Sequence, residues 1–218
     1  MSRQRRREQI LEAAVELFSG KGYHATTMRD IAERLGLQAG SLYVHINSKE
    51  ELLYEIIDRA ADRFLRAVRA ADAEAKERGA APGERLRLAM RAHMRVMAEN
   101  RATAIVFFHE WKFLDQERRR RVRAKRDTYE ELFRAILREG METGAFRHIN
   151  VRLAGLALMS LCNWFYQWFS PEGPLSAEAI ADQFAEFMLR GIERPRAPGG
   201  DDSRSPVQAG QPARKDGP

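Results

Sequence analysis

Residues 27–46 read TMRDIAERLGLQAGSLYVHI, and their pattern decides the fold class. Two short helical runs meet at Gly36, a residue that takes the positive φ of a tight turn between helices without strain. Ala32 is small where the second run must cross the first, and Leu42 anchors the second run from beneath. This spacing predicts a helix-turn-helix, and the leading end of its second helix is the part that enters the major groove of DNA.

Helical spacing continues on both sides of this unit. An apolar stripe over residues 10–18 ends at Gly20 and Gly22, which predicts a glycine C-cap. Ser48 and Glu51 form the two ends of a capping box, and the long helix that it starts runs to about Arg78. No stretch alternates as strands do, so we predict an all-α fold. Nine helices are expected, at about 10–18, 27–35, 39–46, 48–78, 83–99, 101–114, 116–139, 150–169 and 176–190.

The composition limits the class of protein. The 218 residues are 44% hydrophobic and 31% charged, as in an ordinary globular chain with a core. The net charge of +6 favours polyanionic partners, most simply nucleic acid. Cys162 is the only cysteine, the arginine-rich start is not followed by an apolar signal segment, and polar residues interrupt the apolar run at 151–169. We therefore expect no membrane association and a reducing, cytoplasmic setting.

The chain changes character after Ile192. Five of its eight prolines follow, with no aromatic residue and only Val207 as a larger aliphatic side chain. Such a segment cannot bury enough apolar surface to offset the entropy of ordering it, so we expect residues 193–218 to be disordered.

A set of short segments between residues 10 and 53 carries a family resemblance. They are Leu17-Phe18, Gly22-Tyr23, Thr26-Thr27, Ile31-Ala32, Gly36-Leu37, Gly40-Ser41-Leu42-Tyr43, His45 and Ser48-Lys49-Glu50-Glu51-Leu52. With them the stretch resembles the DNA-binding domain of the TetR family of transcriptional regulators. Ile46 departs from the family pattern, which usually has an aromatic residue there.

The resemblance implies an architecture and a mode of action. It implies a nine-helix TetR-type fold, with a three-helix helix-turn-helix domain at 1–62 and a C-terminal helical bundle at 63–192. The bundle is expected to dimerise and to bind a ligand. The implied function is a ligand-responsive transcriptional repressor, bound to a double-stranded DNA operator as a homodimer until a small-molecule effector relieves it. An activator remains a possible variant of the same mechanism.

The side chains around the second helix divide by their chemistry into two expected roles. Hydroxyls, a ring N–H and an ammonium suit phosphates, and such contacts position the protein without specifying a sequence; these come from Thr27, Tyr43, His45 and Lys49. The leading residues are placed to meet base edges, with glutamine suited to adenine and glycine allowing close approach; these are Gln38, Ala39, Gly40 and Ser41. The alternative role of Tyr43 is a packed aromatic. The terminal arginines contact DNA or belong to a frayed end; they are Arg3, Arg5, Arg6 and Arg7.

Two features of the C-terminal half point to an acyl-CoA effector. The segments Asn163-Trp164, Trp168-Phe169 and Leu175-Ser176 look like those of TetR-type regulators of fatty-acid, steroid and aromatic-acid breakdown, which respond to CoA esters. An acyl chain needs an apolar slot, which several side chains could line together with Asn163: Phe107, Trp111, Phe133, Met159 and Trp164. The CoA phosphates need cations, which the basic run at 118–126 could supply through Arg123 and Arg126. The alternative is a solvated basic face over a core of aromatics.

Other functions are weighed against this reading. A regulator of drug efflux would respond to uncharged or cationic hydrophobic compounds, for which Glu110 is the best acidic candidate. A helical small-molecule-binding, enzyme-like protein would need catalytic groups, and no such cluster, cofactor motif or paired metal-ligand spacing is found. The glycine pattern at 20–25 follows a helix rather than a strand, so it favours a helix end over a dinucleotide site.

Two further expectations concern the assembled regulator. The segments 151–169 and 176–190 carry too much apolar surface to leave in water, so we expect a homodimer through them. The helix from Ser48 to about Arg78 joins the two halves, and its far end around Phe64 and Val68 should border the effector pocket. A ligand that shifts this end would change the separation of the two recognition helices.

Overall fold

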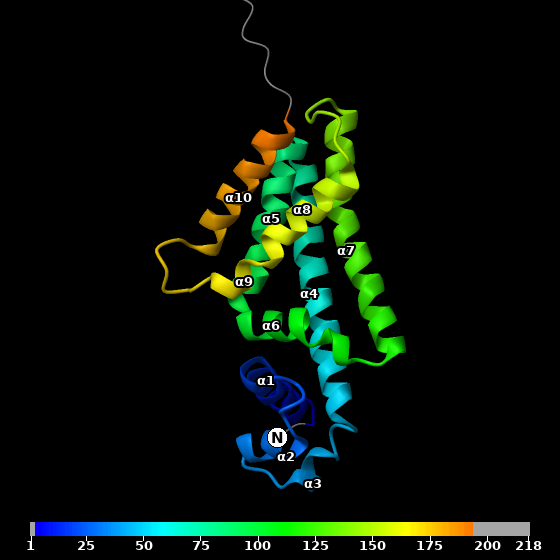
Figure 1. The fold of residues 1–218 in the computed structure, drawn as a ribbon, viewed down its shortest axis with the longest axis vertical. Helices are drawn as coiled ribbons and strands as arrows, with labels where there is room; N and C mark the ends of the chain where they lie inside the picture. Colours follow the sequence, from blue (N-terminus) through cyan, green and yellow to red (C-terminus); the bar gives the residue numbers. More distant parts are fainter. Residues whose placement is uncertain (1–2, 194–218) are drawn as a thin grey trace, which may run out of the picture.

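The helices at the N-terminal end build the expected helix-turn-helix. The computed structural model describes residues 3–193, and the first three helices are α1 (Arg3–Lys21), α2 (Met28–Arg34) and α3 (Ala39–Leu42). They lie together at one end of the molecule (Figure 1). Gly36 has a φ of +65°, as the turn between α2 and α3 requires. Ile31, Ala32 and Leu42 are buried between these helices, whereas Leu35 and Leu37, predicted with Leu42 as the small core, are half-buried against it.

The rest of the described chain is also helical, which confirms the all-α fold. α8 and α9 are separated by Trp164 alone, so they form one interrupted helix and the nine-helix layout is retained. The elements are α4 (Lys49–Glu77), α5 (Pro82–Glu99), α6 (Arg101–His109), the 3-10 turn η1 (Trp111–Phe113), α7 (Gln116–Glu142), α8 (Val151–Asn163), α9 (Phe165–Trp168) and α10 (Ala177–Ile192).

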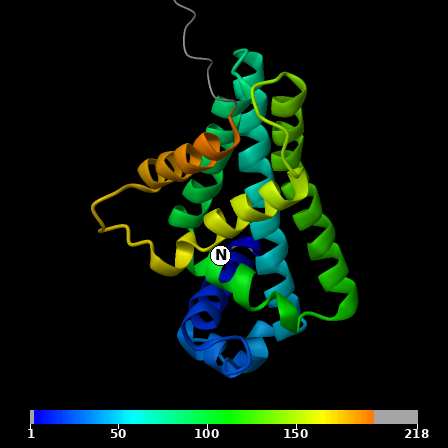
Figure 2. The ribbon, with the colours of Figure 1, turned by 45° about the horizontal axis from the view of Figure 1, so that its top comes forward.

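The long helix α4 connects the two ends of the molecule. Its start packs on the N-terminal helices through Leu52 and Leu53, and its far half packs against α5, α6 and α7 (Figures 1 and 2). The boundary expected between residues 62 and 63 falls inside this continuous helix. α4 therefore joins the helix-turn-helix to the bundle as one continuous helix.

Three helix boundaries differ from the sequence expectation, and two of them have a local reason. α1 begins at Arg3, well before the apolar stripe, because arginine and glutamine are good helix formers. α3 ends at Leu42 because both His45 and Ile46 donate to the Leu42 carbonyl, which closes the chain into a turn. α6 ends at His109, and the chain continues as η1 to Leu114 instead of as one helix.

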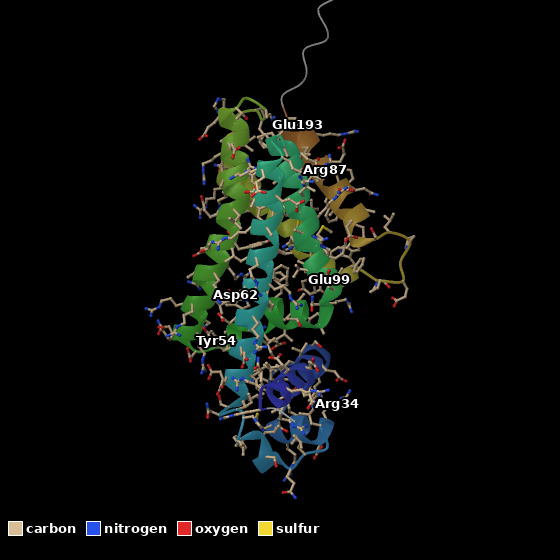
Figure 3. The ribbon with its side chains drawn as sticks, turned by 180° about the vertical axis from the view of Figure 1, so that it is seen from behind. Arg34, Tyr54, Asp62, Arg87, Glu99 and Glu193 are labelled. Atoms are coloured by element: carbon tan, nitrogen blue, oxygen red, sulfur yellow. The ribbon has the colours of Figure 1, made fainter. Side chains whose placement is uncertain are left out.

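A buried ion cluster fixes the end of the bundle farthest from the helix-turn-helix. The Arg85 guanidinium of α5 is 1% exposed and pairs with Asp72 of α4 at 2.7 Å and with Glu139 of α7. The buried charge is that of Arg85, since Glu139 is 42% exposed, and its two acids join α4 and α7 to α5. On the other side of α5, Arg87 lies toward α10 and comes within 3.6 Å of Glu186 (Figure 3).

Three further expectations concern the C-terminal tail, membrane spans and metal sites. The tail expected to be disordered, 193–218, lies outside the described residues except for Glu193. Within residues 3–193 none of the helices has the length and apolar character of a membrane span. No cluster of three or more potential metal-ligating side chains occurs in the same part of the chain.

Candidate DNA-binding surface and effector cavity

The surface of α3 presents the residues expected to read bases. Gln38, Gly40 and Ser41 are exposed, and Ala39 at the helix start is half-buried. Leu42 and Ile46 are buried beneath them, so Ile46 fills the place of the aromatic residue in the family pattern. Exposed polar groups over a fixed apolar base are the geometry that a groove-reading helix needs.

The exposed ends of α2 and α3 offer further donors. Thr27 caps α2 by accepting a hydrogen bond from the Asp30 amide at 3.1 Å, so its own hydroxyl proton remains able to donate to a phosphate. Asp30 in turn accepts from the Thr27 amide and from Lys21, each at 2.7 Å. These contacts, that of Lys21 first, lower the pKa of Asp30 to about 2. Tyr43 is 54% exposed, so the alternative of a packed aromatic does not describe it.

Lys49 has an internal role that its sequence position does not reveal. Its ammonium donates to the carbonyl oxygens of Tyr23 at 2.9 Å and Thr26 at 2.7 Å. It also lies 4.2 Å from the centre of the Tyr23 ring. Lys49 therefore ties the loop after α1 to the start of α4, and one of its three N–H donors is left for a phosphate. His45 is half-buried, and its Nδ1 has no partner among the described residues.

Two of the N-terminal arginines hold the end of the recognition helix. Arg7 donates to the His45 carbonyl at 2.6 Å and forms an ion pair with Glu51 at 2.9 Å. Arg3 reaches the Val44 carbonyl at 3.4 Å. Glu51, expected to reach back to the Ser48 amide, instead accepts from Asn47, through its amide at 3.0 Å. Sequence reasoning missed these contacts because most of them join residues far apart in the chain.

A cavity lies inside the C-terminal bundle, between α4, α5, α6, α7 and α8. Its empty volume is about 380 Å³, including the part that opens to solvent. Its apolar lining side chains are Ala61, Phe64, Phe107, Phe108 and Met159. The polar side chains of the wall are His93, Lys125, Arg126, Tyr129, Glu130 and Asn163. A cavity that combines an apolar part with polar groups is the form that small-molecule sites take.

Arg126 stands at the edge of this cavity in an aromatic setting. Its guanidinium lies 5.5 Å from the centre of the Phe107 ring and 5.2 Å from that of Trp111. Burial among these rings lowers its pKa from the ordinary value, although the group stays charged. A half-buried cation next to an apolar cavity can pair with a ligand that has a hydrocarbon part and an anionic part.

The fold agrees with a sequence comparison. Residues 10–56 match the tetR family of bacterial regulatory proteins, and residues 79–192 match the tetracyclin repressor-like C-terminal domain. The chain belongs to the TetR family. It is 30% identical to the HTH-type transcriptional repressor KstR2 of Mycolicibacterium smegmatis, over 86% of this chain and 90% of that protein.

Solved structures of TetR-family regulators superpose on the chain. PfmR from Thermus thermophilus is 44% identical, with a TM-score of 0.77 that covers 85% of this chain and 99% of that one. AibR, whose structure is in complex with isovaleryl coenzyme A and operator DNA, is 29% identical, with a TM-score of 0.76 over 84% of this chain and 98% of that one. The chain is thus a TetR-family transcriptional regulator.

The cavity of this TetR-family regulator contains about half of the residues expected to bind the effector. Phe107, Arg126, Met159 and Asn163 line it, and Trp111 lies beside it through Arg126. Three expected members lie elsewhere, which corrects the expected wall. Phe133 is fully buried in the core, 5.4 Å from the Tyr129 ring, while Trp164 is 63% exposed and Arg123 is exposed on α7; these three do not line the cavity.

The most informative polar residues of the cavity were missed at the sequence level. His93 and Tyr129 come from α5 and α7, and the Tyr129 hydroxyl contacts the His93 ring. Burial lowers the pKa of His93 to about 3, so its ring is neutral. Both residues stand at ordinary inward positions of amphipathic helices, and only the three-dimensional pairing of α5 with α7 distinguishes them. Phe64, expected to border the pocket, does line it.

The basic run of α7 is mostly engaged in internal pairs. Arg118 pairs with Glu50 at 3.1 Å, which joins α7 to the first turn of α4. Lys125 pairs with Asp58 at 2.6 Å and with Asp62 at 2.8 Å, the latter on the face of α4 seen in Figure 3. The run therefore attaches α7 to α4 as well as contributing Arg126 to the cavity.

The turn η1 connects the cavity to the DNA-binding helices. Trp111 at its start lies under Arg126, and Phe113 at its end stacks on the Tyr23 ring at a centroid distance of 5.8 Å. Phe113 also contacts the His24 ring at 4.0 Å. Tyr23 is the residue whose carbonyl and ring hold Lys49. Contacts thus run without interruption from the cavity edge to the helix-turn-helix.

Large apolar side chains are exposed along the outside of α8, α9 and α10. Trp164 is 63% exposed and Phe187 is 65% exposed. These helices lie on the outside of the bundle (Figure 2). The exposed apolar face also includes Leu153, Leu156, Trp168 and Leu175. An apolar surface of this kind marks a protein interface in most water-exposed proteins.

Proposed function

We propose that the chain is a cytoplasmic repressor that binds an operator as a homodimer and is released from it by a CoA thioester. The observation that carries the proposal is the apolar cavity with Arg126 at its edge. Its wall suits an acyl group, and the cation suits the phosphates of CoA. The likeness to AibR, a structure with isovaleryl coenzyme A and operator DNA, supports the same ligand class.

In the proposed complex the DNA contacts divide as the exposed residues allow. Gln38, Ala39, Gly40 and Ser41 meet base edges, and Thr27, Tyr43, His45 and Lys49 meet phosphates. One helix reads a short site weakly, and two-fold symmetry places two of them on a near-palindrome, about one DNA turn or roughly 34–36 Å apart. The exposed apolar face of α8, α9 and α10 supplies the contact between subunits, since closed two-fold dimers are the commonest assembly.

Release follows from the contacts between the cavity and the N-terminal domain. A ligand that pairs with Arg126 changes the contact of its guanidinium with the Trp111 ring, and therefore the position of η1. Phe113 then moves against Tyr23, while Arg118 and Lys125 transfer any shift of α7 to α4. In this proposal α4 moves as one unit through the domain boundary between residues 62 and 63, and the chain does not bend there.

An efflux-type regulator that binds hydrophobic cations is the second candidate. It would need an acid free to face the ligand, and Glu130 does line the cavity. Glu130 is, however, paired with Arg134 at 2.6 Å, so its charge is already compensated. Glu110, the acid suggested by the sequence, is not among the lining residues. The charge of Arg126 at the edge favours an anionic ligand over a cation.

The test is a titration of the protein on the DNA that flanks its own gene. Fluorescence anisotropy would follow release by acyl-CoAs of increasing chain length, by the matching free acids and by a hydrophobic cation. We expect release by acyl-CoAs alone, with Arg126→Ala losing the response and Arg123→Ala, a matched change on the same helix, retaining most of it. Release by the free acids or the cation, and not by acyl-CoAs, would contradict the proposal.

A further inference from the structure

The cavity wall includes a histidine and a tyrosine that contact each other beside several aromatic side chains. His93 and Tyr129 line it together with the rings of Phe64, Phe107 and Phe108. Phe64 lies against the histidine, with ring centroids 5.1 Å apart. Sequence patterning alone would place a hydrophobic residue at either position. A buried histidine needs hydrogen-bond partners for its ring nitrogens.

The two ring nitrogens of His93 differ in their surroundings. Nδ1 contacts the Tyr129 hydroxyl. Nε2 is buried and has no hydrogen-bond partner among the described residues, and the whole residue is 1% exposed. A buried polar nitrogen without a partner is destabilising, because the water that it loses on folding is not replaced. Nε2 therefore offers a bonding position to a group that enters the cavity.

The protonation state of His93 restricts what that group can be. The ring is neutral at physiological pH, since burial lowers its pKa to about 3. A neutral imidazole has one nitrogen that donates and one that accepts, and the Tyr129 hydroxyl can serve either. A ligand hydroxyl satisfies Nε2 in both tautomers, and a keto oxygen satisfies it when Nε2 carries the proton. A plain hydrocarbon chain satisfies it in neither.

We propose that the acyl group of the effector carries an oxygen substituent, a hydroxyl or keto group, that hydrogen-bonds to Nε2 of His93. The inference rests on the proposed function, because it specifies the acyl part of the same CoA thioester. His93 acts as a specificity-determining residue, and Arg126 serves every CoA thioester alike.

The experiment compares thioesters that differ only in this oxygen. At the chain length that releases the operator best, the unsubstituted acyl-CoA is titrated beside its 3-hydroxy, 4-hydroxy and 3-oxo derivatives. We expect at least one oxygenated thioester to release the operator at a concentration about tenfold below that of the unsubstituted thioester, or lower still. A site built for a polar group discriminates strongly against an analogue that lacks it. Equal or weaker action of all three derivatives would overturn the inference while leaving the CoA effector intact.

Variants separate hydrogen bonding from packing. His93→Phe should bring the effective concentrations of the oxygenated and unsubstituted thioesters together, whereas Met97→Leu, a buried change on α5 outside the cavity wall, should keep the preference. If His93→Phe does not fold, His93→Gln retains a donor and an acceptor and should retain part of the preference. A preference unchanged in His93→Phe would overturn the inference. Failure of every thioester to release the wild-type complex would overturn the proposed function itself.

Discussion

Gly140 on α7 is in contact with the buried ring of Phe146 where a side chain would otherwise stand. A methyl group placed on Gly140 would overlap that ring, and Phe146 is 1% exposed with no space to withdraw. Gly140→Ala should therefore lower the free energy of unfolding by about 1–3 kcal/mol, measured by urea denaturation. Gly191→Ala on α10 is the matched control, because a methyl group there meets nothing within 4 Å. Equal stability of the two variants would contradict the packing described.

His93 makes stability depend on pH in a defined direction. The unfolded imidazole binds a proton below its ordinary pKa of 6.5, whereas burial holds the pKa of the folded ring at about 3. Between these values the unfolded state binds more protons. The contribution is fully present above pH 6.5 and falls by about 1.4 kcal/mol for each pH unit below it. The other ionisable groups that share the cavity are Lys125, Arg126, Tyr129 and Glu130.

The measurement is urea denaturation at pH 7 and pH 5 for the wild type and His93→Phe. The wild type should lose about 2 kcal/mol more than the variant over this interval, since only the wild type must keep a neutral imidazole buried. His93→Gln replaces it if the phenylalanine variant does not fold. An identical loss in wild type and variant would show that the ring is protonated without penalty in the folded state.

Single residues also show where sequence reasoning stops. The exposure of Gln38, Gly40 and Ser41 could be predicted because the periodicity of one short helix fixes it. The internal bonds of Lys49 and Arg7 could not, because their partners lie 23 to 44 positions away in the chain. His93 was missed for the same reason, since its meaning depends on Tyr129 in a different helix.

At the scale of elements, η1 is the part most directly placed to carry the signal. Phe113→Ala should leave operator affinity close to wild type but weaken release by the effector, because it removes the contact of η1 with Tyr23 and His24. The coupling between the two sites should fall by about 0.5–2 kcal/mol, read from the effector concentration at half release. Gln116→Ala, an exposed change just after this turn, serves as the control, because Lys112 itself lies over the Phe113 ring. An unchanged half-release concentration in Phe113→Ala would exclude η1 from the route.

The type of each element was easier to predict than its ends. The caps at Ser48 and Thr27 and the glycine at the turn are local signals, and α2 and the start of α4 agree with them. The break after His109 and the one-residue interruption at Trp164 have no comparable local signal in the sequence. Apolar periodicity shows that a face is covered and does not show by which neighbour.

At the scale of the whole molecule, the exposed apolar face predicts a dimer. The wild type should scatter light as a particle of about 50 kDa, twice the chain mass of 25.0 kDa. Phe187→Asp on α10 places a charge in the contact and should give a monomer with weak operator binding. Val44→Asp, an exposed apolar residue at the opposite end, should keep the dimer and weaken DNA binding. A wild-type particle of 25.0 kDa at micromolar concentration would contradict the proposed assembly.

Trp164, which the sequence analysis expects in the cavity, belongs instead to the exposed apolar face of α8, α9 and α10. A run of aromatic residues at 164–169 suits a pocket wall and an interface equally well, since both bury aromatic surface. In the structure the run divides, with Phe165 and Tyr166 buried and Trp164 and Trp168 exposed. The division follows from the break between α8 and α9, which the sequence pattern does not indicate.

The central claim is that effector and operator bind to different states of one regulator. Linkage then requires that each ligand weakens the other by the same factor, typically about 5- to 150-fold. The direct measurement is the affinity of the effective acyl-CoA, by titration calorimetry, for the free protein and for its complex with the operator. The account predicts tighter binding to the free protein by a factor in this range. Equal affinity for the two would contradict it.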